Sequence, residues 1–266
     1  MNQKKICVFA YNSLGFHCLK ALHDSGISID CLWTYEQRLQ GIPHCADINV
    51  KRIFFGNPND HLSFFQKESF DVMFSFYYKH VLTPEVLKTC PQAFNMHGSL
   101  LPKYRGRCPV NWAILNGETI TGVTLHRMVH KIDAGDIIYQ KEVAITEQHT
   151  AGDVQDRLDQ AAYDLLMEHG RDIVMGTIPS CPQSLSQGSY YGGRTPEDGR
   201  IDITKNHRTI FNLVRAVLPY PRFPGAFLDE HHIVDVSLTP VHTGEKWITI
   251  HGCDGVPIFL KPSTPI

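Results

Sequence analysis

The sequence has no apolar run long enough to cross a membrane and no Lys/Arg-rich run. A membrane-spanning helix needs about 20 apolar residues, and proteins that bind nucleic acid through many phosphates carry a basic excess. The formal net charge here is −2, and the first residues, MNQKKICVFAYN, lead directly into a strand-like run. We therefore expect a cytoplasmic protein with neither a membrane nor a nucleic-acid partner.

The chain also lacks paired metal-binding or redox motifs. None of its eight cysteines forms a C-x-x-C pair, so we expect no zinc knuckle, no bound metal and reduced thiols. The segment HRMVH does not change this, because a metalloprotease motif has Glu after its first His and requires a helix. On the strand expected here, His126 and His130 would lie about 13 Å apart. Both are expected to be structural or surface histidines.

What the sequence does contain is an alternation of short apolar runs and amphipathic segments. Strands are expected at 6–10, 29–34, 52–55, 71–76, 93–97, 121–129 and 137–143. Helices are expected at 16–25, 59–65, 109–116, 150–170 and 206–218, with a further helix start at Thr83-Pro84-Glu85. This β-α rhythm predicts an α/β fold with a doubly wound, mostly parallel sheet.

Composition changes toward the C-terminal third of the chain. Residues 177–198 are rich in Pro, Gly, Ser and Gln, which is typical of a linker. We predict a catalytic domain over residues 1–180, a linker over 181–200 and a small, mainly β C-terminal subdomain over 201–266.

The turn after the first expected strand differs from a dinucleotide-binding loop. No G-x-G-x-x-G follows this strand; Tyr11-Asn12-Ser13 stands there instead, so dinucleotide binding is disfavoured. A helix start can still receive a phosphate group. A phosphate site and a simple β-α connection both remain open at this point.

Asn95 and His97 are the first candidate catalytic residues. They lie two apart at the end of an expected strand, so their side chains share one face, and open α/β sheets bind ligands beyond the carboxyl ends of strands. An Asn amide can donate to an oxygen that gains negative charge, and a His can accept a proton from an attacking amine. The alternative is a histidine that only satisfies hydrogen bonds in a loop or core.

The segment HGSLLPKYRGRCP resembles the H-x-S-L-L-P-x-x-R-G-x-x-P signature of the folate-dependent formyltransferases. Asn95 fits the catalytic Asn of that family, and Asp133, within KIDAGDII, fits its D-x-G-x-I segment. The likeness continues in order through VFAYNSLG, SFYYKHVL, NWAILNGETITGVTLHRMV and RTPEDGRID. Among these enzymes the chain is most similar to the sugar-nucleotide N-formyltransferases, including the domain that acts on UDP-4-amino-4-deoxy-L-arabinose.

The resemblance implies a Rossmann-like formyltransferase fold without a nicotinamide. It implies 10-formyltetrahydrofolate as the donor and, as the acceptor, the primary amine of a nucleotide-linked 4-amino-4-deoxy or 4-amino-4,6-dideoxy sugar used for surface polysaccharide. Asn95 would hold the oxyanion, His97 would manage the amine proton, and Asp133 would orient the imidazole and stabilise its charged form. Related enzymes often form homodimers, which allows the same state here.

Further residues are assigned by the same resemblance. The folate pocket would be lined by His80, Val81, Leu82, Arg107, Val129, His130, Lys131 and Ile132. The acceptor would be met by Tyr11, Asn12, Arg194 and Asp198.

Two alternatives remain at this point. Methionyl-tRNA formyltransferase shares the core signature, but the acidic balance and the short segment after PGAF leave little room for a basic tRNA-binding domain. An inactive module that binds folate or a sugar nucleotide would have no need of the three catalytic residues.

Overall fold

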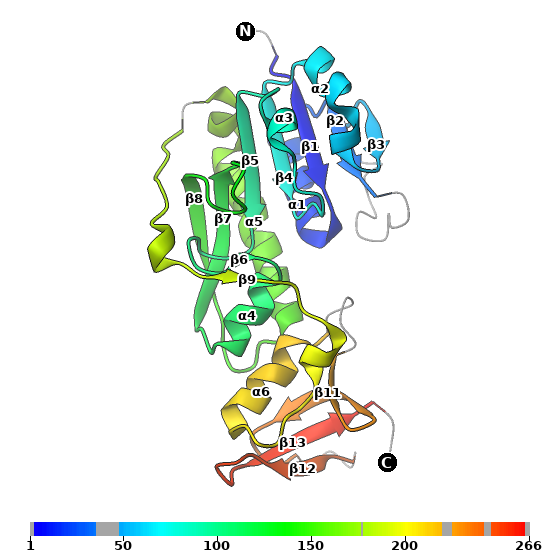
Figure 1. The fold of residues 1–266 in the computed structure, drawn as a ribbon, viewed down its shortest axis with the longest axis vertical. Helices are drawn as coiled ribbons and strands as arrows, with labels where there is room; N and C mark the ends of the chain where they lie inside the picture. The colour runs from blue at the N-terminus through cyan, green and yellow to red at the C-terminus, as the bar shows by residue number, and fades with distance from the viewer. Residues whose placement is uncertain (1–2, 36–47, 177, 220–224, 242–245, 264–266) are drawn as a thin grey trace. The chain divides into compact units, whose positions relative to one another are not determined.

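The computed structural model describes residues 3–35, 48–176, 178–219, 225–241 and 246–263. Pro224 of the PGAF segment lies outside them. Seven strands form a sheet in the order β3-β2-β1-β4-β5-β7-β8 (Figure 1). The strands are β1 (Ile6–Ala10), β2 (Cys31–Thr34), β3 (Ile53–Phe55), β4 (Val72–Phe76), β5 (Gln92–His97), β7 (Ile120–Arg127) and β8 (Ile137–Ala144).

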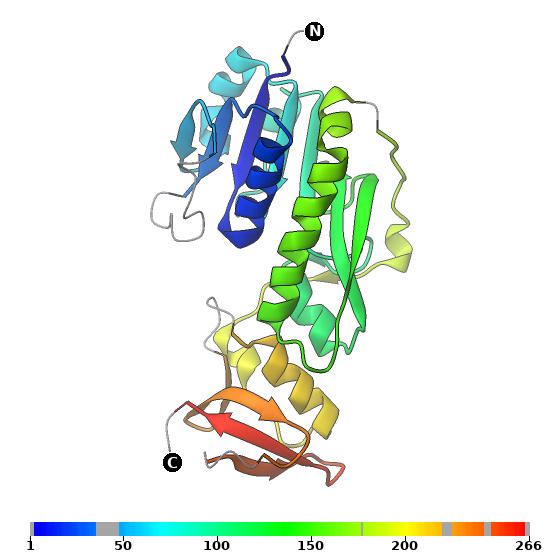
Figure 2. The same cartoon turned by 180° about the vertical axis from the view of Figure 1, so that it is seen from behind.

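The sheet is parallel from β3 to β5, and β7 then pairs with β5 in the antiparallel direction. This confirms the predicted mostly parallel sheet. Helices cover both of its faces: α2 and α3 lie in front of the strands in Figure 1, and α1 and α5 lie in front of them in the reverse view of Figure 2. The helices are α1 (Asn12–Asp24), α2 (Leu62–Glu68), α3 (Pro84–Leu87), α4 (Pro109–Leu115) and α5 (Ala151–Met175), with a 3-10 turn at Pro58–His61.

The central strands β1 and β4 are buried along their whole length, as expected for strands covered by helices on both faces. Alternate residues of β1 point to opposite faces. Cys7 and Phe9 face the side on which α2 and α3 pack. The buried cluster on that side comprises Cys7, Phe9, Cys31, Trp33, Phe65, Phe70, Met73, Leu82, Val86 and Cys90.

Two helix boundaries differ from the sequence expectation. α1 begins at Asn12 rather than at residue 16, because Tyr11 is already the extended N-cap and Leu14 is buried in the first turn. Gly15 lets this turn approach the sheet, since a Cβ there would lie 3.2 Å from the Phe76 carbonyl oxygen. α5 runs on to Met175 because Ile173 and Val174 continue its buried face.

The expected start of α3 is confirmed. Thr83 is the N-cap, its hydroxyl accepts from the Val86 N–H, and Pro84 takes the first helical position. Proline suits this position because its missing N–H would have no helical partner there. The cap therefore fixes where the chain turns after the segment 80–82.

The chain divides into two compact units, which interleave along the sequence. Unit 1 comprises residues 1–105, 122–143 and 157–190, and unit 2 comprises residues 106–121, 144–156 and 191–266. The sequence-continuous domains ending at 180 and 200 stay a prediction. No helix in the described parts of the chain has the length and apolar character needed to cross a membrane.

Unit 2 contains a four-stranded sheet in the order β10-β11-β13-β12, packed against α6, which agrees with the expected mainly β C-terminal region. Its pairs are antiparallel, and Ile210 and Val214 of α6 meet Ile233, Ile258 and Leu260 of the sheet in one buried cluster. The elements are α6 (His207–Ala216), β10 (Ala226–Leu228), β11 (His231–Ser237), β12 (Ile248–His251) and β13 (Pro257–Pro262).

The segment expected to be a linker has structure of its own. It contains 3-10 turns at Leu185–Gln187 and Pro196–Gly199 and the short strand β9 (Tyr190–Tyr191), which pairs with β6 (Arg105–Gly106). Within unit 1, Cys181 and Ile137 exchange two backbone hydrogen bonds of 2.8 Å, and the Arg105 N–H donates to the Ser189 carbonyl. A segment without a regular pattern of apolar residues can therefore still make specific backbone hydrogen bonds.

A prediction concerns Glu68 at the end of α2. Its carboxylate accepts two hydrogen bonds from Arg52, at 2.8 and 2.9 Å. The hydrogen bonds from Arg52, and then from Lys5, lower its pKa from 4.5 to about 2. A depressed folded-state pKa stabilises the fold above the unfolded value and loses this contribution as pH falls toward 2. Because the pair is partly exposed, Glu68→Gln should lower the melting temperature at pH 7 by only about 1–3 °C.

The difference between wild type and Glu68→Gln should shrink between about pH 5 and pH 2. Melting curves followed by circular dichroism across this range measure it. Glu142→Gln, which removes an exposed carboxylate from β8, is the matched control. A difference that stays constant down to pH 2 would contradict the ion-pair explanation.

Candidate active site

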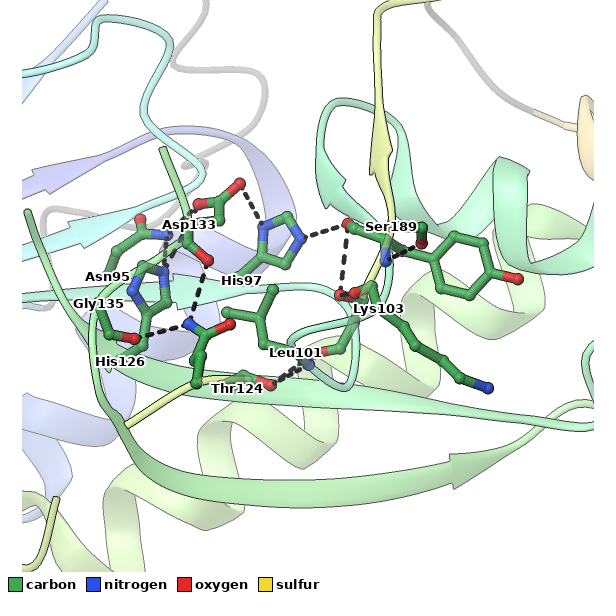
Figure 3. A network of polar contacts seen from close by, with 12 residues as sticks. Asn95, His97, Leu101, Lys103, Thr124, His126, Asp133, Gly135 and Ser189 are labelled. Atoms are coloured by element: carbon green, nitrogen blue, oxygen red, sulfur yellow. Dashed lines mark hydrogen bonds and ion pairs between the residues drawn. The ribbon is translucent and has the colours of Figure 1, made fainter. Parts of the chain in front are cut away.

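The candidate site is organised by the pairing of β5 with β7. In this antiparallel register Asn95 lies opposite His126, and His97 lies opposite Thr124. Residues directly opposite each other in an antiparallel pair have Cβ atoms about 5 Å apart, so each candidate on β5 faces a polar partner on β7. The four side chains gather at the carboxyl end of β5 (Figure 3), as the sequence predicts for Asn95 and His97.

Asp133 reaches the same cluster from the turn between β7 and β8. Its Oδ2 lies 3.6 Å from His97 Nδ1, and its Oδ1 lies 3.5 Å from Asn95 Nδ2 (Figure 3). The three residues assigned by resemblance are therefore brought together. The side chains of His97 and Asp133 are 8% and 10% exposed, which strengthens electrostatic interactions relative to water.

The backbone of this turn is held in an uncommon conformation. Asp133 has φ of 51°, in the left-handed region, which Asp adopts more readily than most residues. Gln183 Nε2 donates to the carbonyl oxygens of Asp133 and Gly135, at 3.1 and 2.6 Å. Gly135 is required because a Cβ there would collide with the Arg127 carbonyl oxygen. The turn is thus fixed from β7 on one side and from the segment after α5 on the other.

His97 is oriented by the loop that follows it. Its Nε2 lies 2.8 Å from the Tyr104 carbonyl oxygen, and because a carbonyl only accepts, Nε2 carries a proton. Nδ1 faces the Asp133 carboxylate. In the neutral imidazole, Nδ1 therefore carries the lone pair that can accept a proton, and Asp133 stabilises the cation that forms.

The loop over residues 98–104 explains what several motif residues do. The Ser99 hydroxyl donates to the Lys103 carbonyl at 2.7 Å, and the Leu101 N–H donates to the Thr124 hydroxyl at 3.1 Å. Thr124 in turn donates to the Ser99 carbonyl at 2.6 Å. These bonds fold the loop back onto β7 (Figure 3), and the Tyr104 carbonyl at its end accepts the hydrogen bond from His97 Nε2.

His126 also lies in this cluster, where the sequence does not place it. The sequence predicts a structural or surface histidine, and the structure has a buried one: it is 2% exposed, and its Nε2 lies 3.0 Å from Asn95 Nδ2 and 3.6 Å from Asp133 Oδ1. No periodicity in the sequence reveals this, because the contact depends on the β5–β7 register. His130, the other histidine of HRMVH, is exposed.

The two segments assigned to the folate pocket lie in unit 1. His80 is half-buried and stacks on Tyr35, with ring centroids 5.7 Å apart, whereas Val81 is 59% exposed. The Leu82 side chain is buried in the core, with 5% exposed. Residues Val129, His130, Lys131 and Ile132 are all exposed in the β7–β8 turn that leads to Asp133.

Electrostatics link these two segments. The pKa of Glu85, in the first turn of α3, is lowered by its own backbone N–H, then by Thr83, with smaller contributions that include the charge of His130. The turn 129–132 therefore lies within electrostatic range of α3, which directly follows residues 80–82. A folate pocket shared by the two segments, and the roles of their individual residues, stay predictions.

Tyr11 and Asn12, assigned to the acceptor, lie at the start of α1. The Tyr11 ring packs edge-on against Tyr35, and the Lys79 ammonium lies 4.5 Å from its centroid. The Asn12 Oδ1 is buried without a hydrogen-bond partner, and its backbone has φ of 58°. The turn is therefore a polar, cationic feature, and its role in binding stays a prediction.

Arg107, Arg194 and Asp198 lie in unit 2. Arg194 lies over the Trp112 ring at 5.1 Å, donates to the Asp198 carbonyl at 2.6 Å, and has a pKa lowered by burial. The Asp198 carboxylate accepts from the backbone N–H and the hydroxyl of Thr195, which forms a capping box. Asp198 thus stabilises its own turn, and the binding roles of all three residues stay predictions.

Among the described residues no group of three or more His, Cys, Asp and Glu side chains is arranged to hold a metal ion. The chemistry available to the cluster of Asn95, His97, His126 and Asp133 is hydrogen-bond donation, proton transfer and electrostatic stabilisation. This set suits acyl transfer to an amine.

Gln183 provides a test of how the Asp133 turn is held. Gln183→Glu keeps the size of the side chain but replaces two N–H donors by a carboxylate beside two carbonyl oxygens. We expect turnover to fall about 10-fold or more, because small misplacements of a catalytic group are costly, and the melting temperature to fall as well, because two part-buried carbonyls lose their donor. Steady-state kinetics with Gln187→Glu, an exposed control, would measure it; equal activities in the two variants would exclude this positioning role.

Comparisons with known proteins agree with this chemistry. Residues 57–169, which include Asn95, His97 and Asp133, match the family model for formyl transferase. The fold resembles that of WlaRD, a sugar 3N-formyl transferase solved in the presence of dTDP and 5-N-formyl-THF, with 20% identity, 100% of both chains covered and a TM-score of 0.79.

Two further solved structures are similar over nearly the whole chain. One is the N-formyltransferase of Helicobacter canadensis in complex with folinic acid and dTDP-3-aminofucose, with 20% identity, 97% of this chain and 99% of the other covered, and a TM-score of 0.79. The other is a 4-N formyltransferase from Francisella tularensis, with 18% identity, 98% of both chains covered and a TM-score of 0.72. Identities this low establish the shared fold. The formyl transferase family model matches residues 57–169, which are 113 of the 266 residues.

Proposed function

We propose that this enzyme transfers a formyl group from 10-formyltetrahydrofolate to the primary amine of a nucleotide-linked amino sugar. The observation that carries the proposal is the buried cluster of Asn95, His97 and Asp133 at the carboxyl end of β5, inside the region that matches the formyl transferase family.

The donor is supported by both the relatives and the local chemistry. The WlaRD structure was solved with 5-N-formyl-THF and the Helicobacter canadensis structure with folinic acid. In this chain the exposed apolar side chains of Val81, Val129 and Ile132 adjoin the catalytic Asp133 turn or α3. Such residues suit the flat, partly apolar pterin ring.

The acceptor class is supported by the same relatives. One was solved with dTDP-3-aminofucose, and the others are described as 3-N and 4-N formyltransferases. The fold is therefore compatible with an amine at either position. We propose a 4-amino-4-deoxy or 4-amino-4,6-dideoxy sugar as the acceptor, because the sequence resemblance implies it. A homodimer and a cytoplasmic location stay predictions.

In the proposed mechanism each residue has a separate step. The amine nitrogen forms a bond to the formyl carbon, and Asn95 Nδ2–H donates to the formyl oxygen as it gains negative charge. His97 Nδ1 accepts the amine proton, beside the Asp133 carboxylate. The bond from the formyl carbon to the folate nitrogen then breaks, and this nitrogen takes up the proton. The products are a formamide and tetrahydrofolate.

The direct test incubates the protein with 10-formyltetrahydrofolate and a panel of UDP-, dTDP- and GDP-linked 3-amino and 4-amino sugars. Mass spectrometry should detect one added formyl group on a 4-amino sugar nucleotide. Formylation of charged initiator tRNA with no turnover of amino sugars would overturn the acceptor. Folate binding without formylation of any amine would favour an inactive binding module.

His97→Ala and Asp133→Asn should each lower turnover by about 10²–10⁴-fold, because the amine proton then lacks an acceptor or that acceptor lacks its stabilising charge. Affinity for 5-formyltetrahydrofolate, measured by calorimetry, should change only a few-fold. His251→Ala, an exposed histidine of unit 2, serves as the control. Near-normal turnover in either catalytic variant, with the fold intact by circular dichroism, would refute the assigned roles.

A further inference from the structure

We propose that His126 is a positioning residue for formyl transfer. It holds the Asn95 side-chain amide so that an N–H of this amide points toward the reacting oxygen. The proposal rests on the proposed function. It starts from a contact inside the sheet: His126 and Asn95 are directly opposed on β7 and β5, and His126 Nε2 lies 3.0 Å from Asn95 Nδ2.

The hydrogen-bond partners of His126 define its tautomer. Nδ1 lies 2.9 Å from the carbonyl oxygen of Arg127, and a carbonyl oxygen only accepts, so Nδ1 carries the proton. In the neutral ring Nε2 is then an acceptor. Its partner at 3.0 Å has to be a donor, which fixes the nitrogen of the Asn95 amide, and not its oxygen, on this side.

The opposite orientation of the amide is disfavoured at two points. Rotation by 180° would bring the Asn95 Oδ1 close to the lone pair of His126 Nε2 and close to Asp133 Oδ1, so that acceptors would face acceptors. The contact with Asp133 alone favours the observed orientation of the amide only weakly, because Asp133 Oδ1 lies 3.5 Å from Asn95 Nδ2, at the limit of a hydrogen bond. His126 is therefore the main selector of the orientation.

The amide nitrogen of Asn95 carries two hydrogens, and they have different partners. One hydrogen is donated to His126. The other has Asp133 Oδ1 as an acceptor only at 3.5 Å, so it is available to an oxygen that approaches the cluster. An oxyanion donor is effective when it is already oriented before the reaction.

His126 is itself held rigidly. It is 2% exposed, and its acceptor, the Arg127 carbonyl, packs against Gly135 in the turn that carries Asp133. The Arg127 N–H donates to the Asp136 carbonyl at 2.9 Å, and its guanidinium lies 5.3 Å from the Phe94 ring. The groups facing His126 that carry charge or titrate are Asp133 from the turn and, two residues along β5 from Asn95, His97.

The test compares His126→Phe, which keeps a planar ring without an acceptor, with His126→Gln, whose side-chain oxygen can accept from Asn95. We expect His126→Phe to lower kcat about 10–100-fold with KM for both substrates within about twofold, and His126→Gln to restore part of the loss. His251→Phe, at an exposed histidine of unit 2, should stay near wild type. Normal kcat in His126→Phe would overturn the proposal.

A double-mutant cycle separates positioning from a purely structural effect. In an Asn95→Ala background, His126→Phe should have almost no further effect on kcat, because the amide it orients is gone. An equal loss in both backgrounds would show that His126 acts through the fold and not through Asn95. Thermal melting of all four proteins identifies any variant that fails to fold, for which His126→Gln supplies the second comparison.

A readout independent of activity keeps this proposal separate from the proposed function. The ¹⁵N shifts of the His126 ring in the wild-type protein should show Nδ1 protonated and Nε2 unprotonated. If no acceptor is formylated, the proposed function fails, while these shifts still decide whether His126 can hold the Asn95 amide. A protonated Nε2 in the neutral ring would overturn the inference even in an active enzyme.

Discussion

The antiparallel pairing of β7 with β5 is the constraint on which the site depends. Strands β3 to β5 are parallel, so their chains all enter and leave the sheet at the same ends. Because β7 runs the other way, its last residue, Arg127, lies opposite Phe94 near the start of β5, and the turn that follows has to fold back along β5 to bring Asp133 to Asn95 and His97. A slip of one residue in this register would turn every paired side chain to the opposite face.

Short sequence patterns predict the strands, the helix starts and the face on which a strand residue lies. The apolar runs of β1 and β4 indicate strands buried on both faces, Thr83-Pro84 marks a helix start, and the spacing of Asn95 and His97 puts both on one face. The start of α1 was missed because a polar turn such as Tyr11-Asn12-Ser13 has no apolar period, although Leu14 already packs in the core.

The contacts that sequence reasoning missed are long-range and polar. His126 belongs to the site only through its register with Asn95, and Gln183 only because the chain returns past the Asp133 turn after α5. A Pro-, Gly- and Ser-rich composition indicates irregular backbone, not isolation. Such a segment still has to satisfy its own polar groups, and here the Gln183 side chain also donates to the carbonyls of the turn that carries Asp133. The identity of Asp133 itself came from resemblance and not from spacing.

The Asp133 carboxylate connects the two halves of the proposed chemistry. Its Oδ2 faces His97, which handles the proton, and its Oδ1 faces Asn95 and His126, which present the donor for the oxyanion. One side chain can serve both because its backbone lies in the left-handed region, at the tip of a turn held by Gln183 and closed against β7 at Gly135. In the proposed mechanism, proton acceptance and oxyanion stabilisation therefore both depend on a single backbone conformation. A change in that turn would disturb both at once, and the fold holds the turn from two sides.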